Sequence, residues 1–339
     1  MPRVAILGAT GAVGEVLRTV LAEREFPVDD LICLASPRSA GKRVRFGDDE
    51  VEVQAVAPEL FEGVDIALFS AGGSRSKEWA PIAVERGAVV VDNSSAFRME
   101  PDVPLVVADV NPEAARGHRG IVANPNCSTM QLMPVLKPIL DTVGIERVVI
   151  STYQAVSGTG QHAIDGLLDE AEASLGSKTP EPAVYPHRIA FNVIPVAGSF
   201  SGEDGYTDEE LKLVHESRKI LSAPDLRVSA TCVRVPVVTG HSEAVWVETR
   251  EPLSPEGLRD LLMEREGIVV VDDPASHAYP TPLDAAGSDD VYVGRIRRDL
   301  GSDNGLAFWV VSDNLRKGAA TNAVQIAELL VRDGLLARR

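Results

Sequence analysis

A short apolar run, a glycine-rich turn and a helical pattern follow one another within the first 21 residues of the chain. The apolar run covers Arg3 to Leu7, the turn begins at Gly8, and apolar residues then recur at helical spacing as far as Leu21. Glycines in such a turn let backbone amides approach a pyrophosphate, and the helix N-terminus stabilises its charge. The order of strand, turn and helix therefore predicts a dinucleotide-binding site. The residues expected to bind the cofactor there are Gly8, Thr10, Gly11, Ala12 and Val13.

Further apolar runs alternate with longer polar or helical segments over the first 126 residues. This alternation predicts a parallel sheet covered by helices, which is an α/β fold with a Rossmann-type dinucleotide-binding domain. The runs expected to form its later strands are Leu31 to Ala35, Ile66 to Ser70, Val89 to Val91, Leu105 to Ala108 and Ile121 to Ala123.

A chain of 339 residues is longer than one hydrophobic core usually supports, so a second domain is expected. From Val148 onwards the apolar runs are longer, as in Val228 to Val238 and Ala244 to Thr249, which predicts an antiparallel sheet in an α+β domain. The proline-rich stretch from Ser174 to Arg188 is expected to be an irregular excursion, and the last apolar pattern, from Ala320 to Leu330, a docked helix. The predicted domains are 1–126 plus 314–339, and 127–313.

The loop after the second predicted strand indicates which cofactor is bound. An NAD-binding domain places a carboxylate there, whereas this chain reads Ala35-Ser36-Pro37-Arg38-Ser39. Ser36, Arg38 and Ser39, with nearby Lys42, are suited to bind a 2′-phosphate, so NADP is predicted; solvated loop residues are the alternative. Ala71 and Gly72 end another strand and are expected to pass over the cofactor. Because the glycine spacing departs from Gly-x-Gly-x-x-Gly, a turn without ligand stays an alternative.

Composition excludes several classes of partner. The chain has 50 acidic and 33 basic side chains, and a net charge of -17 disfavours nucleic acid. No apolar run approaches the roughly 20 residues that a membrane span needs, and no leader peptide is expected because the first strand begins close to Met1.

The three cysteines are far apart, with no metal-binding pair, which is typical of a reducing cytoplasm.

One cysteine differs from the other two in its setting. Cys33 and Cys232 lie in apolar runs that predict buried strands, while Cys127 lies in a turn between Asn124-Pro125-Asn126 and Ser128-Thr129. A helix is expected to follow from Thr129 to Leu140, and its dipole would favour the thiolate. Cys127 is therefore the predicted nucleophile, with a plain loop cysteine as the alternative.

With these motifs in place, the chain resembles the aspartate-β-semialdehyde dehydrogenase family over nearly its full length. The resemblance includes the glycine-rich turn and several further motifs in the family's order. These are Asn93-Ser94-Ser95-Ala96-Phe97-Arg98, Asn124-Pro125-Asn126-Cys127-Ser128-Thr129, Gln154-Ala155-Val156-Ser157-Gly158, Glu209-Glu210-Leu211-Lys212, Arg234-Val235-Pro236-Val237, Gly240-His241 and Asp313-Asn314-Leu315-Arg316-Lys317-Gly318-Ala319-Ala320.

The resemblance implies a cytoplasmic homodimer that interconverts aspartate semialdehyde, phosphate and NADP with aspartyl phosphate and NADPH, on the path to lysine, methionine and threonine. An aldehyde yields hydride readily only after a nucleophile has added to it, and a thiolate then leaves a thioester, here on Cys127. His241 is expected to accept the thiol proton. Arg234, which stands among valines, is expected to bind the substrate carboxylate, with a structural salt bridge as the alternative.

The remaining site residues are carried over from the resemblance alone. Arg98 and Lys212 are expected to hold phosphate, and Glu209 the substrate ammonium. Gln154 is expected to orient the substrate, and Asn126 to donate to the developing oxyanion. Residues expected near the nicotinamide are Ser157, Gly158 and Asn314.

Two rival functions stay open on the sequence. One is an N-acetyl-glutamyl-phosphate reductase, in which a His-Pro-Gly context is expected before the cysteine, where this chain has Asn124-Pro125-Asn126. The other is a noncatalytic binding relative, which would be expected to lack the nucleophile, whereas both Cys127 and His241 are present.

Overall fold

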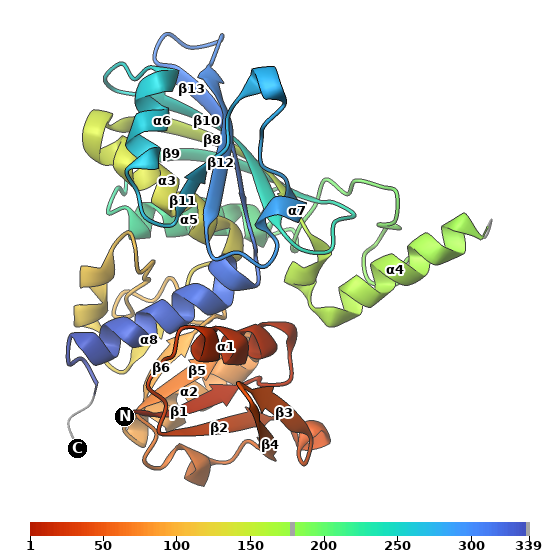
Figure 1. Ribbon diagram of the computed structural model, residues 1–339, viewed down its shortest axis with the longest axis vertical. Coiled ribbons are helices and arrows are strands. Elements are labelled where there is room, and N and C mark those ends of the chain that lie inside the picture. The colour runs from red at the N-terminus through yellow and green to blue at the C-terminus, as the bar shows by residue number, and fades with distance from the viewer. Residues whose placement is uncertain (177–179, 337–339) are drawn as a thin grey trace. The chain divides into compact units, whose positions relative to one another are not determined.

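The computed structural model describes residues 1–176 and 180–336, and the chain divides into two compact units (Figure 1). The first unit comprises Met1–Asn126 with Ala319–Arg339, and the second comprises Cys127–Gly318. Residues 314–318, which the sequence assigns to the first domain, group with the second unit. Residues 337–339 of that predicted domain lie outside the described residues.

A seven-stranded sheet forms the centre of the first unit, with the strand order β3-β4-β2-β1-β5-β6-β7. Neighbouring strands pair in parallel except β3 and β4, which form an antiparallel pair at one edge. The strands are β1 (Arg3–Leu7), β2 (Asp30–Ala35), β3 (Arg43–Phe46), β4 (Asp49–Ala55), β5 (Ile66–Phe69), β6 (Val89–Asp92) and β7 (Ile121–Ala123). The predicted parallel sheet is confirmed.

One predicted strand of this unit is wrong. The run Leu105 to Ala108 forms only a single bridge, in which Leu105 pairs with Ala123, although Val106 and Val107 are fully buried. A buried segment that has no strand partners can have the same apolar sequence pattern as a strand. The antiparallel pair β3 and β4 has no counterpart in the prediction, because its apolar residues alternate with charged ones and form no continuous apolar run.

Alternate residues of the strands enter two different cores, as expected of a sheet covered on both faces. Val4 and Ile6 of β1 belong to a core shared with α1 (Ala12–Glu23) and α8 (Asn322–Arg332). Ala5 and Leu7 belong to the opposite core, shared with α2 (Gly73–Glu85). The predicted apolar stripe of the last helix is buried in the first of these cores, so its docking surface is within this unit. Short helical turns complete the unit: η1 (Pro37–Ser39), η2 (Pro58–Phe61) and η3 (Pro112–Gly117).

The second unit is built on a six-stranded mixed sheet with the order β11-β12-β13-β10-β8-β9. Its central pairs are antiparallel, as predicted, but β9 joins β8 in parallel and β11 joins β12 in parallel. The strands are β8 (Ile145–Gln154), β9 (Arg227–Arg234), β10 (His241–Thr249), β11 (Ile268–Val270), β12 (Val291–Arg298) and β13 (Gly305–Ser312).

Three helices pack on one face of this sheet, namely α3 (Cys127–Val143), α5 (Asp208–Ile220) and α6 (Pro255–Met263). The opposite face presents large aromatic side chains, Tyr153, Trp246 and Trp309, each half-buried in the single chain. Helix α7 (Pro282–Ala285) and the turns η4 (Val156–Thr159), η5 (Pro274–Ser276) and the π-helical η6 (Arg316–Thr321) complete the elements.

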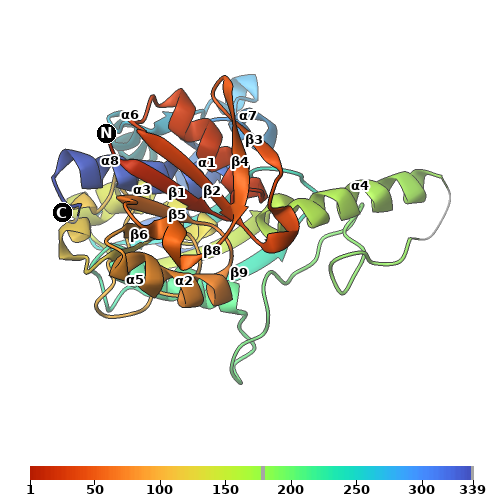
Figure 2. The same ribbon diagram turned by 90° about the horizontal axis from the view of Figure 1, so that it is seen from below.

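Helix α4 (Gln161–Leu175) extends outward from the sheet of the second unit, and an irregular segment returns beside it (Figures 1 and 2). This segment contains most of the predicted proline-rich excursion, of which 177–179 lie outside the described residues. It packs on α4 through a small core that includes Leu167, Ile189 and Ala190. None of the helices in the described ranges combines the length and apolar character that crossing a bilayer requires.

Candidate active site

The glycine-rich turn of the first unit has no room for side chains. Gly8 has a φ of +94°, and a Cβ atom there would lie 2.3 Å from the carbonyl oxygen of Ser70. A Cβ atom on Gly14 would lie 2.2 Å from the carbonyl oxygen of Gly8. Helix α1 begins at Ala12, so its first-turn amides have no acceptor inside the helix and are available to an anion. The turn therefore fits a dinucleotide pyrophosphate.

The other residues predicted to bind the cofactor differ in exposure. Ser36, which precedes η1, and Arg38, which lies within it, are exposed, whereas Ser39 is buried. Arg38 forms no ion pair within the described part of the chain. Thr10 and Gly72 are exposed, and Gly72 caps the N-terminus of α2 with a φ of +85°. A free guanidinium at the end of β2 is suited to a 2′-phosphate.

The three cysteines differ in accessibility. Cys33 in β2 and Cys232 in β9 are fully buried, as predicted, and burial raises the pKa of Cys33 to about 11 and raises that of Cys232 further. Cys127 is only half-buried and is the first residue of α3. A Cβ atom on Gly318 would lie 2.9 Å from the Cβ atom of Cys127, so the chain passes close to this side chain.

The peptide of Ala155, immediately after β8, holds two of the predicted site residues. Its N–H donates to Nδ1 of His241 at 3.1 Å, and its carbonyl oxygen accepts from Nη1 of Arg234 at 2.7 Å. Strand β8 brings these side chains together because it lies between β9, which ends at Arg234, and β10, which begins at His241. This peptide is not identifiable as functional from the sequence, since both contacts are made by backbone atoms.

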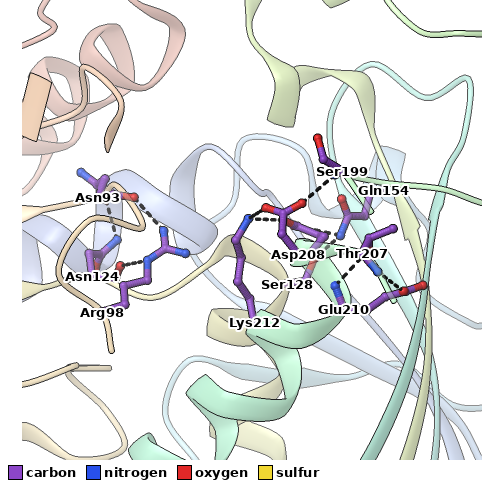
Figure 3. Close-up of polar contacts among 11 residues, drawn as sticks. Asn93, Arg98, Asn124, Ser128, Gln154, Ser199, Thr207, Asp208, Glu210 and Lys212 are labelled. Atoms are coloured by element: carbon purple, nitrogen blue, oxygen red, sulfur yellow. Dashed lines mark hydrogen bonds and ion pairs between the residues drawn. The ribbon is translucent and has the colours of Figure 1, made fainter. Parts of the chain in front are cut away.

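Gln154 links this peptide to Ser128, the residue that follows Cys127. Its Nε2 atom donates to Oγ of Ser128 at 2.8 Å (Figure 3). The same atom donates to Oε1 of Glu209 at 3.3 Å. Ser128 follows Cys127 in the first turn of α3. The predicted residues Gln154, Arg234, His241 and Glu209 therefore converge on one side of the sheet of the second unit.

His241 is neutral in this environment. Burial lowers the pKa of its imidazole to about 3; the nearby Arg234 lowers it as well, and Glu209 acts in the opposite direction. Because Nδ1 accepts the Ala155 N–H, the proton of the neutral ring lies on Nε2. The expected proton acceptor is thus arranged as a hydrogen-bond donor, since accepting a second proton would set two N–H groups against each other.

The loop after β8 approaches the same ring. A Cβ atom on Gly158 would lie 3.2 Å from Nε2 of His241 and 3.4 Å from Nη1 of Arg234. Ser157 in the same turn accepts a hydrogen bond from Nδ2 of Asn314 at 2.9 Å, and Oδ1 of Asn314 accepts the N–H of Gly240 at 2.9 Å. Asn314 thereby ties the turn η4 to the residue that precedes His241.

Lys212 and Glu209 lie in the first turns of α5. The Lys212 ammonium is 2.6 Å from Asp208 (Figure 3) and, by a second ion pair, 3.0 Å from Glu209. Burial lowers the pKa of Lys212, but the two carboxylates outweigh it and raise the pKa above its ordinary value. A capping box of Thr207 and Glu210 begins the helix, and Glu210 also accepts the N–H of Cys232, which fixes α5 to β9.

Arg98 and Asn126 belong to the first unit. Arg98 is buried and donates from Nε to the carbonyl oxygen of Asn124 at 2.9 Å and from Nη2 to that of Asn93 at 2.7 Å (Figure 3). Asn126 is buried and precedes Cys127 in the chain. The described residues contain no group of three or more His, Cys, Asp or Glu side chains that could hold a metal ion.

A buried carboxyl group lies two residues after His241 on β10. Glu243 is 0% exposed, and burial raises its pKa well above the ordinary value of 4.5, with a smaller opposing effect of Gln131. Above pH 4.5 the unfolded chain therefore releases a proton that the folded protein keeps. The contribution of Glu243 to stability is present below that pH and falls as pH rises towards the raised pKa, by up to about 1.4 kcal/mol per pH unit.

We accordingly expect Glu243→Gln to gain stability relative to the wild type between pH 5 and pH 8, because the amide cannot ionise. The free energy of unfolding by urea, measured at several pH values, gives this difference. Glu248→Gln, on the same strand but half-exposed, is the control and should follow the wild type. Parallel curves for Glu243→Gln and wild type would show that Glu243 is ionised in the folded protein.

Comparisons with known proteins show which proteins the chain is similar to. Two family models match, "Semialdehyde dehydrogenase, NAD binding domain" over residues 3–118 and "Semialdehyde dehydrogenase, dimerisation domain" over residues 136–317. An aspartate-semialdehyde dehydrogenase of Aquifex aeolicus is 55% identical, covering 98% of this chain and 99% of the relative.

Two solved structures are similar to this chain in fold as well as in sequence. Aspartate semialdehyde dehydrogenase II from Vibrio cholerae, complexed with ASA, matches with a TM-score of 0.95 and 52% identity over 98% of this chain and 99% of the other. The enzyme from Candida albicans, solved with NADP, matches with a TM-score of 0.75 and 28% identity over 99% of this chain and 100% of the other.

Proposed function

The chain belongs to the aspartate-semialdehyde dehydrogenase family, and from this premise we propose how its residues divide the work of the reaction. The reaction interconverts aspartate semialdehyde, phosphate and oxidised cofactor with aspartyl phosphate and reduced cofactor, on the path to lysine, methionine and threonine. The observation that carries the assignment of roles is the Ala155 peptide, which holds Arg234 and His241 together, next to a glutamine bonded to the neighbour of Cys127.

Cys127 adds to the aldehyde carbon and becomes acylated. Its place at the start of α3 favours the thiolate, and its partial exposure leaves it open to substrate. The Nε2–H of His241 donates to the oxygen that becomes negative when sulfur adds, and Asn126 is assigned a second donor role. The bound cofactor supplies the hydride acceptor. Phosphate then displaces the Cys127 thiolate from the thioester, which gives the acyl phosphate.

Recognition of aspartate semialdehyde depends on charges held by the second unit. Arg234 is assigned the substrate carboxylate, because it is buried and has no carboxylate within ion-pair distance in the described residues. Glu209 is assigned the substrate ammonium, and Gln154 orients the acyl group beside Cys127. Arg98 of the first unit and Lys212 of the second are both assigned to phosphate.

The activity is tested by following absorbance at the NADPH band with aspartate semialdehyde and phosphate. We expect signal with this substrate and none with N-acetyl-glutamate semialdehyde, since His-Pro-Gly is absent before Cys127. Activity with the second substrate alone would assign the chain to the rival reductase. No signal with either would favour a noncatalytic binding protein.

The cofactor is a nicotinamide dinucleotide, and NADP is the form we propose. The support is the exposed Arg38 without an ion pair, together with Ser36 and Ser39, in the turn that follows β2. Ser157 and Gly158 are assigned to the nicotinamide end, and Ala71 with Gly72 to the backbone that passes over the cofactor. Asn314 is assigned to the same end through the Ser157 hydroxyl that it holds.

Arg38→Glu should weaken use of NADP much more than use of NAD, because it replaces a cation beside the 2′-phosphate with an anion. We expect the NADP/NAD ratio of kcat/KM to fall by about 10-fold or more, which corresponds to about 1.4 kcal/mol. Arg43→Glu, a nearby exposed charge reversal on β3, is the control and should leave the ratio unchanged. An unaltered ratio in Arg38→Glu would mean that the 2′-phosphate is bound elsewhere.

We propose a homodimer as the working form. The support is the match of residues 136–317 to a dimerisation domain, together with the half-buried aromatic side chains Tyr153, Trp246 and Trp309 on the sheet face opposite α3. Aromatic side chains on a flat sheet are typical of protein interfaces.

A further inference from the structure

Arg234 carries a buried positive charge that the protein compensates incompletely. Its side chain is 7% exposed, and Nη1 donates to the carbonyl oxygen of Ala155. Its Nε atom is buried and has no hydrogen-bond partner among the described residues. Desolvating a charge without compensation is unfavourable, so something else must stabilise the guanidinium before a substrate arrives.

An aromatic ring lies over this guanidinium. The Cζ atom of Arg234 is 5.7 Å from the centroid of the Tyr185 ring, a distance at which the ring's quadrupole attracts a cation. The Tyr185 hydroxyl donates to Oγ1 of Thr159 at 2.9 Å. Thr159 ends the turn η4, which also contains Ser157 and Gly158. The ring is therefore fixed at its hydroxyl end as well as by the guanidinium.

The segment that carries Tyr185 is anchored on both sides of it. The buried carboxylate of Glu170 on α4 accepts three backbone N–H groups, those of Ala183 at 3.0 Å, Ile189 at 2.7 Å and Ala190 at 3.0 Å. A little further on, the backbone of Ile194 exchanges two hydrogen bonds with the backbone of Arg234, at 2.8 and 3.0 Å. The irregular segment that carries Tyr185 is thus attached to the end of β9.

We infer that Tyr185 is a positioning residue for the carboxylate-binding guanidinium of Arg234, an inference that rests on the proposed function. The ring compensates the buried charge on one face and restricts the guanidinium's rotation, while the donors along its edge stay available to a carboxylate. Thr159 holds the ring, and Glu170 holds the segment. The role proposed for Tyr185 needs no contact between its side chain and the aldehyde or the cofactor.

The test compares two substrates in a set of variants. With aspartate semialdehyde, Tyr185→Leu should lower kcat/KM by about 10-fold, mainly through KM, because the guanidinium is no longer held in place. With propanal, which has no carboxylate, kcat/KM should be unchanged. Arg234→Lys keeps the charge but loses the planar fork, so it should show the same substrate pattern with a larger loss.

Conservative substitutions distinguish a loss of guanidinium positioning from a failure of the variant to fold. Tyr185→Phe keeps the ring and loses only the bond to Thr159, so we expect a loss of about 2- to 3-fold, and the same for Thr159→Val. Phe191→Leu, an exposed aromatic in the same segment, should behave as wild type. Thermal unfolding of each variant identifies any that fail to fold, and Tyr185→Phe and Thr159→Val then carry the test.

Two outcomes would overturn the inference. One is an equal loss with both substrates in Tyr185→Leu, which would show a general disturbance of the site. The other is unchanged kinetics in Tyr185→Leu while Arg234→Lys is impaired, which would show that the ring is not needed to position the guanidinium. If the wild type itself does not turn over aspartate semialdehyde, the proposed function fails instead, and that result is visible in the same series.

Discussion

Cys127→Ala should bind the cofactor normally and show no phosphate-dependent turnover of aspartate semialdehyde. Without the thiolate no thiohemiacetal can form, so hydride transfer has no tetrahedral precursor and phosphate has no thioester to attack. Turnover is measured at the NADPH band, and cofactor affinity by fluorescence titration. Cys33→Ala and Cys232→Ala are matched controls, because both cysteines are fully buried, and they should keep wild-type turnover.

The covalent intermediate can be detected without turnover. Enzyme mixed with semialdehyde and oxidised cofactor, but no phosphate, should gain an aspartyl adduct on the peptide containing Cys127, and Cys127→Ala should gain none. Wild-type turnover by Cys127→Ala would contradict the thioester mechanism and the assignment of the nucleophile.

His241→Asn should lower kcat by about 10²- to 10⁴-fold, the range for losing a proton-transfer group or a donor to a developing oxyanion. The shorter amide takes the place of Nδ1 and leaves no donor where Nε2–H lies. His241→Gln extends an amide towards the Nε2 position and should lose less. In a Cys127→Ala background neither change should reduce activity further, because the imidazole can only assist a thiol that is present.

The pH profile distinguishes the two roles of His241. A ring whose pKa is about 3 stays neutral throughout the working range, so the acid limb of kcat/KM should be the same in wild type and His241→Gln. If instead the wild type showed a limb near pH 6.5 that disappears in His241→Gln, the ring would be titrating, and it would act as the proton acceptor that the sequence predicts.

Several features of this protein follow from the sequence because their causes are local. A run of apolar residues before Gly8 and a helical stripe after it define a strand, a turn and a helix, and the structure has all three. The setting of Cys127 among turn residues, against the apolar settings of Cys33 and Cys232, is enough to separate the half-buried thiol from the two buried ones. Side-chain type and spacing carry this information within a few residues.

Other features depend on pairing between distant segments, and local patterns do not contain them. The run at Leu105 is as apolar as a strand but forms only one bridge. The parallel addition of β9 to β8 likewise follows from the sheet order and not from the composition of either strand.

The chemistry of the site shows the same division. His241 and Arg234 are identifiable from their motifs, but the Ala155 peptide that holds both follows a third strand, β8, and it determines which imidazole nitrogen carries the proton. Tyr185 lies 49 positions before Arg234 in an irregular segment, and only the tertiary structure brings its ring over the guanidinium. Residue identity determines which groups can react, whereas burial and backbone contacts from distant segments determine their protonation and orientation.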